Sequence, residues 1–117
     1  MHNFKELKVW KMSIELTKLV FELTRSFPNE HKFGLSNQLF RCAVSIPSNI
    51  AEGCGRKSDK ELKQFVSISL GSSFELETQI IIAKEVDLIT IEQFDSINSK
   101  LLEIQKMLNG LSKSLDN

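Results

Sequence analysis

The sequence predicts an all-α fold, an antiparallel up-down-up-down four-helix bundle with a kinked second helix, formed as a single domain by residues 1–117. Three observations support this prediction. Apolar residues recur at a period near 3.6 along most of the chain. Two prolines and five glycines leave few of the residues that tight β-turns require. The links between the four helical segments are short, so consecutive helices should alternate in direction.

The first helix is predicted over residues 4–27 and has two neighbouring apolar stripes. One stripe contains Leu7, Trp10, Ile14 and Phe21, and the other contains Val9, Leu16, Val20, Leu23 and Phe27. A helix in a monomeric bundle needs about three apolar positions in seven. The excess predicts that this helix contacts a second subunit as well as its own core.

The other three helices follow from their terminal signals and apolar faces. The second is predicted over residues 34–54, after Pro28 and Asn29 end the first, and Gly53 and Gly55 favour its termination. The third begins after Ser58, with Glu61 completing a capping box, and ends near residue 85. Thr90 caps the fourth. Its seam, spaced in threes and fours, contains Ile91, Phe94, Ile97, Leu101, Ile104, Leu108, Leu111 and Leu115.

The stretch RCAVSIPSNIAEGCGR, residues 41–56, carries polar side chains along one face of the second helix. In an antiparallel pair with the third helix, facing positions sum to about 115. Arg41 should therefore pair with Glu75, or with Glu77 nearby, and breaking a buried pair of this kind costs roughly 3–5 kcal/mol. The structural polar motif contains Arg41, Ser45, Pro47, Asn49, Glu52, Glu75 and Glu77.

Pro47 should kink this helix, because it lacks an N–H and its ring presses against the carbonyl of Ala43. Ser or Asn side chains could supply the missing donor. Small residues at Ser45 and Gly71 should let the two helices approach closely. Kink, close packing and one ion pair are the favoured interpretation, while a ligand site or a polar subunit contact stays open.

The sequence contains no reactive constellation, so we expect neither an enzyme nor a cofactor or metal site. His2 and His31 are the only histidines, and neither lies in a motif that supplies a catalytic base. Cys42 and Cys54 are twelve residues apart, which matches no common zinc spacing, so both should be reduced and buried. No segment has the apolar length of a membrane span or a signal peptide, and we expect a cytoplasmic protein.

Charge is sorted between the two ends of the predicted bundle although the formal net charge is zero. One end gathers nine basic residues against five acidic ones, about +4, and the other end is about −4. The basic end could contact phosphates, and a ring would multiply its effect. The alternative is a solvated surface of mixed sign without a partner. The candidate nucleic-acid contacts are Lys5, Lys8, Lys11, Arg56, Lys57, Lys60 and Lys63.

Several motifs together resemble a known family. They are FKELKVW at 4–10, GLSNQLFR at 34–41, AVSIPSNIAEG at 43–53 and GSSFELETQ at 71–79. Nearly the whole chain is similar to the four-helix bundle proteins encoded in intervening sequences of bacterial 23S ribosomal RNA genes. Phe33 stands where tyrosine is common in that family, and Cys42 where alanine is common. The resemblance implies a homopentamer, and kinship with the accessory protein of diversity-generating retroelements, which binds nucleic acid and a reverse transcriptase.

Two functional hypotheses follow from the charge sorting and the resemblance. The first is a non-enzymatic oligomeric bundle that binds structured RNA or other nucleic acid through its basic end. The alternative is a structural adaptor that binds a protein partner through an apolar or acidic surface, without contacting nucleic acid. Sparse aromatic residues at the basic end favour backbone contact over base-specific recognition.

Overall fold

The computed structural model describes residues 2–116, apart from the side chains of Lys32 and Phe33, so the departure noted at Phe33 lies outside the described side chains. Over these residues it contains four α-helices and no strand, which confirms the all-α bundle. The α-helices are α1 (Lys8–Arg25), α2 (Asn37–Cys54), α3 (Asp59–Glu85) and α4 (Ile91–Ser114). A 3₁₀ turn (Phe4–Glu6) precedes α1, and a 3₁₀ turn (Asn29–His31) and a π-helical segment (Lys32–Ser36) join α1 to α2.

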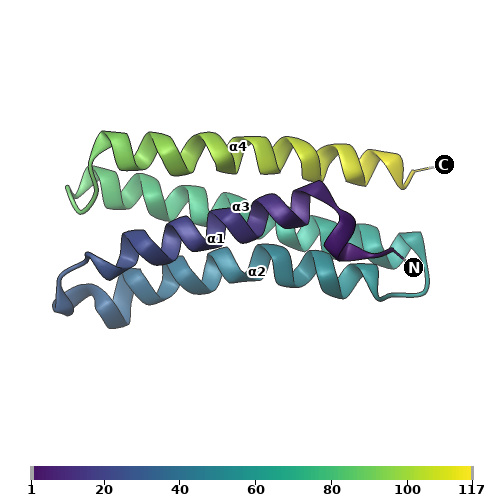
Figure 1. The fold of residues 1–117 in the computed structure, drawn as a ribbon, viewed down its shortest axis with the longest axis horizontal. Helices are drawn as coiled ribbons and strands as arrows, with labels where there is room; N and C mark the ends of the chain where they lie inside the picture. The colour runs from purple at the N-terminus through teal and green to yellow at the C-terminus, as the bar shows by residue number, and fades with distance from the viewer. Residues whose placement is uncertain (1, 117) are drawn as a thin grey trace.

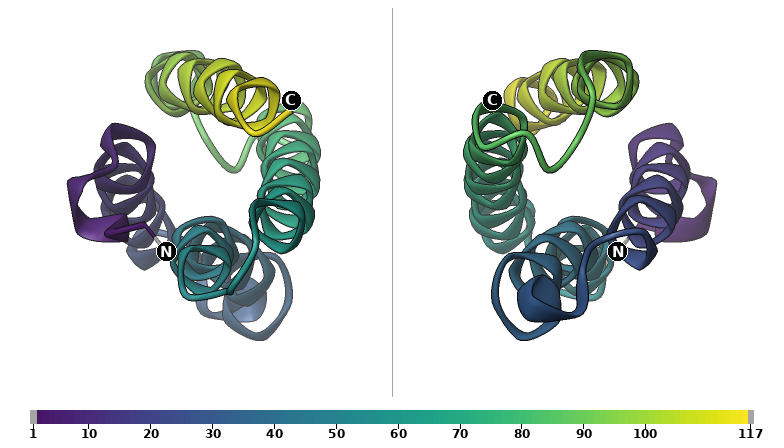
Figure 2. Two further views of the ribbon diagram at one scale, coloured as in Figure 1. Left: turned by 90° about the vertical axis from the view of Figure 1, so that its right-hand side faces the viewer. Right: turned by 90° about the vertical axis from the view of Figure 1, so that its left-hand side faces the viewer.

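The chain runs back and forth along the long axis, and each helix lies beside the one before it (Figure 1). Viewed along that axis, the helices form a ring in which α1 also contacts α4 (Figure 2). As a result, α1 and α3 stand diagonally opposite each other. The N-terminal segment, the turn between α2 and α3, and the end of α4 share one end of the bundle (Figure 1).

The core lies along the axis of this ring and draws side chains from all four α-helices. Leu16, Ile46, Leu76 and Leu101, one from each helix, are completely buried. On α1, the stripe that runs from Val9 to Phe27 is buried throughout, as the periodicity predicts. The other stripe lies nearer the surface: Leu7, Trp10 and Ile14 are half-buried, and only Phe21 is exposed.

Two helix starts differ from the sequence prediction. The first helix does not run continuously from Phe4: Asn3 caps a 3₁₀ turn through the Lys5 N–H at 3.2 Å, and Leu7 is extended before α1 begins. Helix α2 begins at Asn37 rather than Gly34, because the backbone of Gly34 is not helical. These differences shorten both helices by about one turn at the N-terminus.

The predicted caps of α3 and α4 are present. The Ser58 hydroxyl accepts a hydrogen bond from the Glu61 N–H at 3.2 Å, which is the first half of the predicted capping box. The second half is not formed, because the Glu61 carboxylate accepts from the Ser58 hydroxyl rather than from the Ser58 backbone N–H. Thr90 and Gln93 form a complete capping box, with bonds of 3.1 and 2.8 Å. Asp87, with a φ of 62°, makes the turn between the two helices.

Candidate functional site

A hydrogen-bonded seam joins α2 to α3, and Ser45 is the residue of the predicted motif that bonds across it. The hydroxyl groups of Ser45 and Ser72 lie 2.8 Å apart. Ser69, which is fully buried, donates to the carbonyl of Ile46 at 3.0 Å. The thiol of Cys42 donates to the carbonyl of Ser72 at 3.1 Å. These contacts match the predicted antiparallel register to within two residues and tie the two helix backbones together.

The donor that serves the backbone near Pro47 comes from a different helix than the sequence suggested. Helix α2 continues through Pro47, which is buried and cannot donate to the carbonyl of Ala43. The hydroxyl of Thr17 on α1 lies 3.3 Å from that carbonyl and 2.7 Å from the carbonyl of Ser13. The side chain of Asn49 does not reach the carbonyl of Ala43 and donates to the carbonyl of Ser45 at 2.8 Å. Thr17 was missed because the register of α2 against α3 carries no information about contacts with α1.

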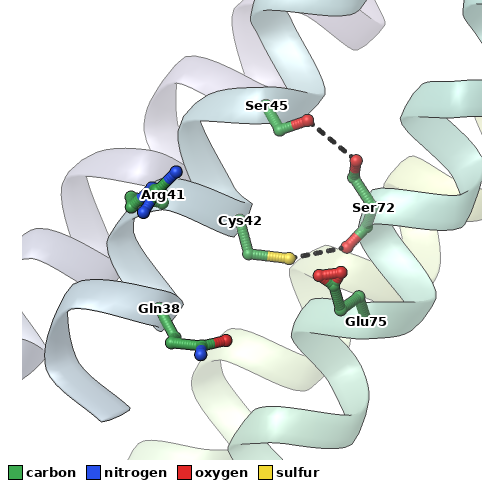
Figure 3. Close-up of a pocket in the computed structure, with 6 residues that line it drawn as sticks. All are labelled: Gln38, Arg41, Cys42, Ser45, Ser72 and Glu75. Carbon is green, nitrogen blue, oxygen red and sulfur yellow. Dashed lines mark hydrogen bonds between the residues drawn. The ribbon is translucent and has the colours of Figure 1, made fainter. Parts of the chain in front are cut away.

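A hollow of about 370 Å³ opens where the seam reaches the surface. Figure 3 shows its six lining residues, Gln38, Arg41, Cys42, Ser45, Ser72 and Glu75. Arg41 and Glu75 border the same hollow from α2 and α3. However, no ion pair within 4.0 Å joins them among the described side chains. The predicted Arg41–Glu75 ion pair is therefore wrong, because both side chains are exposed and reach water instead.

Glu77 does not belong to this seam. Its carboxylate accepts a hydrogen bond from Gln105 on α4 at 2.9 Å. Two residues along a helix correspond to a rotation of about 200°, so Glu75 and Glu77 face different neighbours. The predicted alternative pairing of Arg41 with Glu77 is wrong for this geometric reason.

Both cysteines are free and buried. Burial, followed by the negative charge of Glu75, raises the pKa of the Cys42 thiol to about 12. Burial likewise raises the pKa of Cys54. Because the thiolate is the nucleophilic form, these environments keep both groups protonated and unreactive near neutral pH. The expectation of reduced, buried thiols is confirmed.

The seven predicted nucleic-acid contacts lie at one end of the bundle, but two of them already have acidic partners. Arg56 binds Glu52 at 2.8 Å, and its guanidinium lies 4.8 Å from the centre of the Phe65 ring. Lys63 forms an ion pair with Asp116. Glu52 therefore belongs to this end rather than to the seam. The remaining contacts are exposed and outside the ion pairs of the described residues: Lys5, Lys8, Lys11, Lys57 and Lys60.

Gly53 fixes the approach of α2 to α3 beside this basic end. A Cβ atom placed on Gly53 would lie 2.7 Å from the Cβ of Phe65 and 2.9 Å from a methyl group of Leu62. Gly53 is helical, so its role is close packing rather than the predicted termination. The reverse holds for Gly71, where an added Cβ would meet nothing within 4 Å. The prediction that Gly71 lets the helices approach is wrong, because it faces outward.

Two further observations bear on the kind of site this chain can hold. Within residues 2–116, no group of three or more His, Cys, Asp or Glu side chains could bind a metal ion. None of the helices described is long and apolar enough to cross a membrane.

The fold and the site define a class: an antiparallel helical bundle with hydrogen-bonded polar residues between helices and a lysine-rich end. The chain belongs to the family of 23S rRNA-intervening sequence proteins, whose sequence profile matches residues 5–110. This confirms the resemblance found in the sequence motifs.

A solved structure gives the same result. The chain is similar to a crystal structure from Bacteroides thetaiotaomicron, described as a protein with unknown function from the S23 ribosomal protein family. The sequences are 31% identical and the TM-score is 0.84, over 90% of this chain and 95% of that chain. No curated protein matches the chain.

Proposed function

We propose that this protein acts by binding rather than by catalysis, as an oligomer whose basic end contacts the phosphate backbone of structured RNA in the cytoplasm. The observation that carries this proposal is the set of five exposed lysines, Lys5, Lys8, Lys11, Lys57 and Lys60, which have no acidic partner in the described ion pairs. The family's name refers to 23S rRNA, which supports an RNA partner.

Backbone contact explains the residue types at this end. Lysine ammonium groups neutralise phosphates without reading bases, and each neutralised phosphate contributes roughly −0.7 to −0.9 to the slope of log K against log salt concentration. Lys57 and Lys60 lie on either side of the α3 N-terminus, where backbone N–H groups also favour an anion. Repetition of this end around an oligomer would raise the effective affinity without adding a new contact.

The outer stripe of α1 supports the oligomer. Phe21 is 46% exposed and its ring packs against Phe40 of α2, with ring centres 5.5 Å apart. Both rings line a surface hollow of about 610 Å³ between α1 and α2. Farther along the same groove lie Trp10 and Ile14. We call this surface, with Phe21, Phe40, Trp10 and Ile14, the α1/α2 groove. A second subunit that covers it would remove apolar area from water.

A charge-reversal pair tests the RNA contact. Lys57→Glu with Lys60→Glu should weaken binding to a structured RNA and make the salt slope shallower by about 1.5 per subunit, since two phosphate contacts are lost. The matched control is Lys84→Glu with Lys100→Glu, which changes the charge equally at positions on α3 and α4 that lie outside both the basic end and the α1/α2 groove. Equal losses in both doubles, or a flat salt slope in the unmodified protein, would contradict the proposal.

The oligomer is tested separately by light scattering at micromolar concentration without RNA. The family resemblance predicts five subunits, and a mass equal to the 13.3 kDa protomer would refute assembly. Partner capture that survives nuclease treatment, together with no RNA binding, would favour the protein-adaptor alternative.

A further inference from the structure

The hollow between α2 and α3 carries two opposite charges that the protomer does not pair with each other (Figure 3). Arg41 borders the hollow from α2, and Glu75 borders it from α3. Neither side chain takes part in any ion pair within 4.0 Å among the described residues. The N–H donors of a guanidinium and the acceptor oxygens of a carboxylate are therefore both available at one hollow.

Neutral polar groups beside these charges also have hydrogen-bonding capacity left. Among the described hydrogen bonds, the Ser72 hydroxyl contacts only the Ser45 hydroxyl, at 2.8 Å, and a hydroxyl can form more than one bond. The Oε1 of Gln38 accepts from Gln79 at 3.4 Å, which leaves the Nε2 of Gln38 free to donate. The buried Oε1 of Gln79 has no hydrogen-bond partner among the described residues. The polar groups around the hollow therefore offer more bonds than this chain uses.

The combination of charges restricts the chemistry of an occupant. Glu75 would repel a phosphate or another simple anion, and Arg41 would repel a simple cation. An apolar molecule would leave the polar lining without partners. None of the six lining residues is aromatic, so a nucleobase would have no side chain on which to stack. A molecule that carries a carboxylate for Arg41 and an ammonium group for Glu75 satisfies both charges.

Size and position restrict the occupant further. The hollow has a volume of about 370 Å³, at the small end of the range of roughly 300–1,000 Å³ for ligand pockets. Arg41 lies about 20 Å along α2 from Cys54, which is the last residue of that helix and belongs to the lysine-rich end. RNA held by the lysines at that end has no need of this hollow. A small molecule fits both the volume and the position.

We propose that the hollow binds a free α-amino acid, with its carboxylate paired to the Arg41 guanidinium and its ammonium group paired to the Glu75 carboxylate. Ser72 and Gln38 give the ligand additional hydrogen bonds. The bound amino acid links α2 to α3 where the protomer alone forms no ion pair between its described side chains. This site is independent of the proposed RNA contact and oligomer, because it uses neither the lysine-rich end nor the α1/α2 groove.

Calorimetric titration of the full-length protein with each standard L-amino acid, without RNA, tests the proposal. At least one amino acid should bind and reach saturation. Its α-amide lacks the carboxylate and its N-acetyl derivative lacks the ammonium group, so each should bind about tenfold more weakly or worse. If no amino acid binds, or if either derivative binds as well as the parent amino acid, the proposal is overturned.

Substitutions at the two charges locate the ligand. Arg41→Gln and Glu75→Gln should each weaken binding about tenfold or more. Helical circular dichroism should stay unchanged, because both side chains are exposed. Glu77→Gln is the matched control: it is the same substitution on the same helix, but Glu77 faces Gln105 on α4, so binding should not change. Equal losses in Glu75→Gln and Glu77→Gln, or full binding by Arg41→Gln or Glu75→Gln, would overturn the proposal.

NMR spectra of the unmodified protein give a measurement that depends on no variant. The amino acid that binds should shift the backbone amide signals of Cys42 and Ser72, which line the hollow, more than the amide signals of α1 and α4. Shifts centred on any other part of the bundle would show that the amino acid binds elsewhere, and would overturn the proposal.

Discussion

Replacing Gly53 by alanine should destabilise the protein, although alanine is the better helix former. Gly53 lies inside α2, where the change alone would stabilise the helix by roughly 0.5–1 kcal/mol. The added methyl group would, however, lie 2.7 Å from the Cβ of Phe65. That atom is attached directly to the α3 backbone and cannot rotate away. Relief therefore requires the end of α2 to move away from the start of α3.

Overpacking of a well-packed contact costs about 1–3 kcal/mol, which exceeds the gain in helix propensity. We expect a net loss of about 1–2 kcal/mol in the free energy of unfolding, and a fall in Tm of roughly 4 °C for each kcal/mol, since unfolding entropy is about 2.1 cal/mol/K per residue. Urea titration followed by circular dichroism measures the loss. Protein concentration must be held constant, since assembly would contribute to the apparent stability.

Gly110→Ala is the matched control, because Gly110 is also helical but has nothing within 4 Å of an added Cβ. It should stabilise the protein by up to about 1 kcal/mol through propensity alone. The two substitutions are chemically identical and are predicted to have opposite signs. If Gly53→Ala stabilised the protein as much as Gly110→Ala, the close approach of α2 and α3 would be refuted.

Three further changes test individual interactions. Thr17→Val should lower the free energy of unfolding by about 0.5–1.5 kcal/mol in the unmodified protein. The loss should be smaller in a Pro47→Ala background, because residue 47 then has a backbone N–H that can donate to the carbonyl of Ala43. If the losses from the two substitutions simply add in a double-mutant cycle, this coupling is contradicted. Thr90→Ala should cost about 1 kcal/mol and Thr90→Ser much less, and equal losses in urea would exclude the capping box. For Cys42, a folded pKa of about 12 against 9.0 means that the native state holds the proton more tightly. Stability from this group is therefore complete below pH 9 and falls as the pH rises toward 12, so Cys42→Ala should flatten that alkaline decline, and an unchanged decline would argue against the shift.

The helix positions were predictable because the buried residues recur at the helical period along the sequence. The stripe from Val9 to Phe27 and the Thr90 cap depend on residues close in sequence, and both occur as predicted. The start of α1 was not predictable from apolar spacing, since Phe4 fits the stripe but Asn3 captures the backbone in a separate 3₁₀ turn. A local hydrogen bond from the backbone to the Asn3 side chain therefore sets where the helix begins.

The site was predictable only to the level of helix register. The predicted register placed Ser45 opposite residues 70 and 71, and in the structure it bonds to Ser72, because two antiparallel helices joined by a short turn have little freedom to slide. It could not say whether Arg41 reaches Glu75, since both side chains are long and exposed and gain little from pairing in water. Contacts that involve a third helix, such as Thr17 with Ala43, depend on bundle geometry that no pairwise register contains.

The distribution of satisfied and exposed polar groups separates stability from binding in this chain. Ser45, Ser69 and Asn49 use their hydrogen-bonding groups within the protomer, so substitutions there should change the free energy of unfolding first. Lys57 and Lys60 are exposed at the α3 N-terminus and take part in none of the described ion pairs, so their removal should leave folding nearly intact and change association. A family motif centred on Pro47 can therefore identify the fold, while the proposed contacts with an RNA partner lie outside that motif, at the lysine-rich end of the bundle.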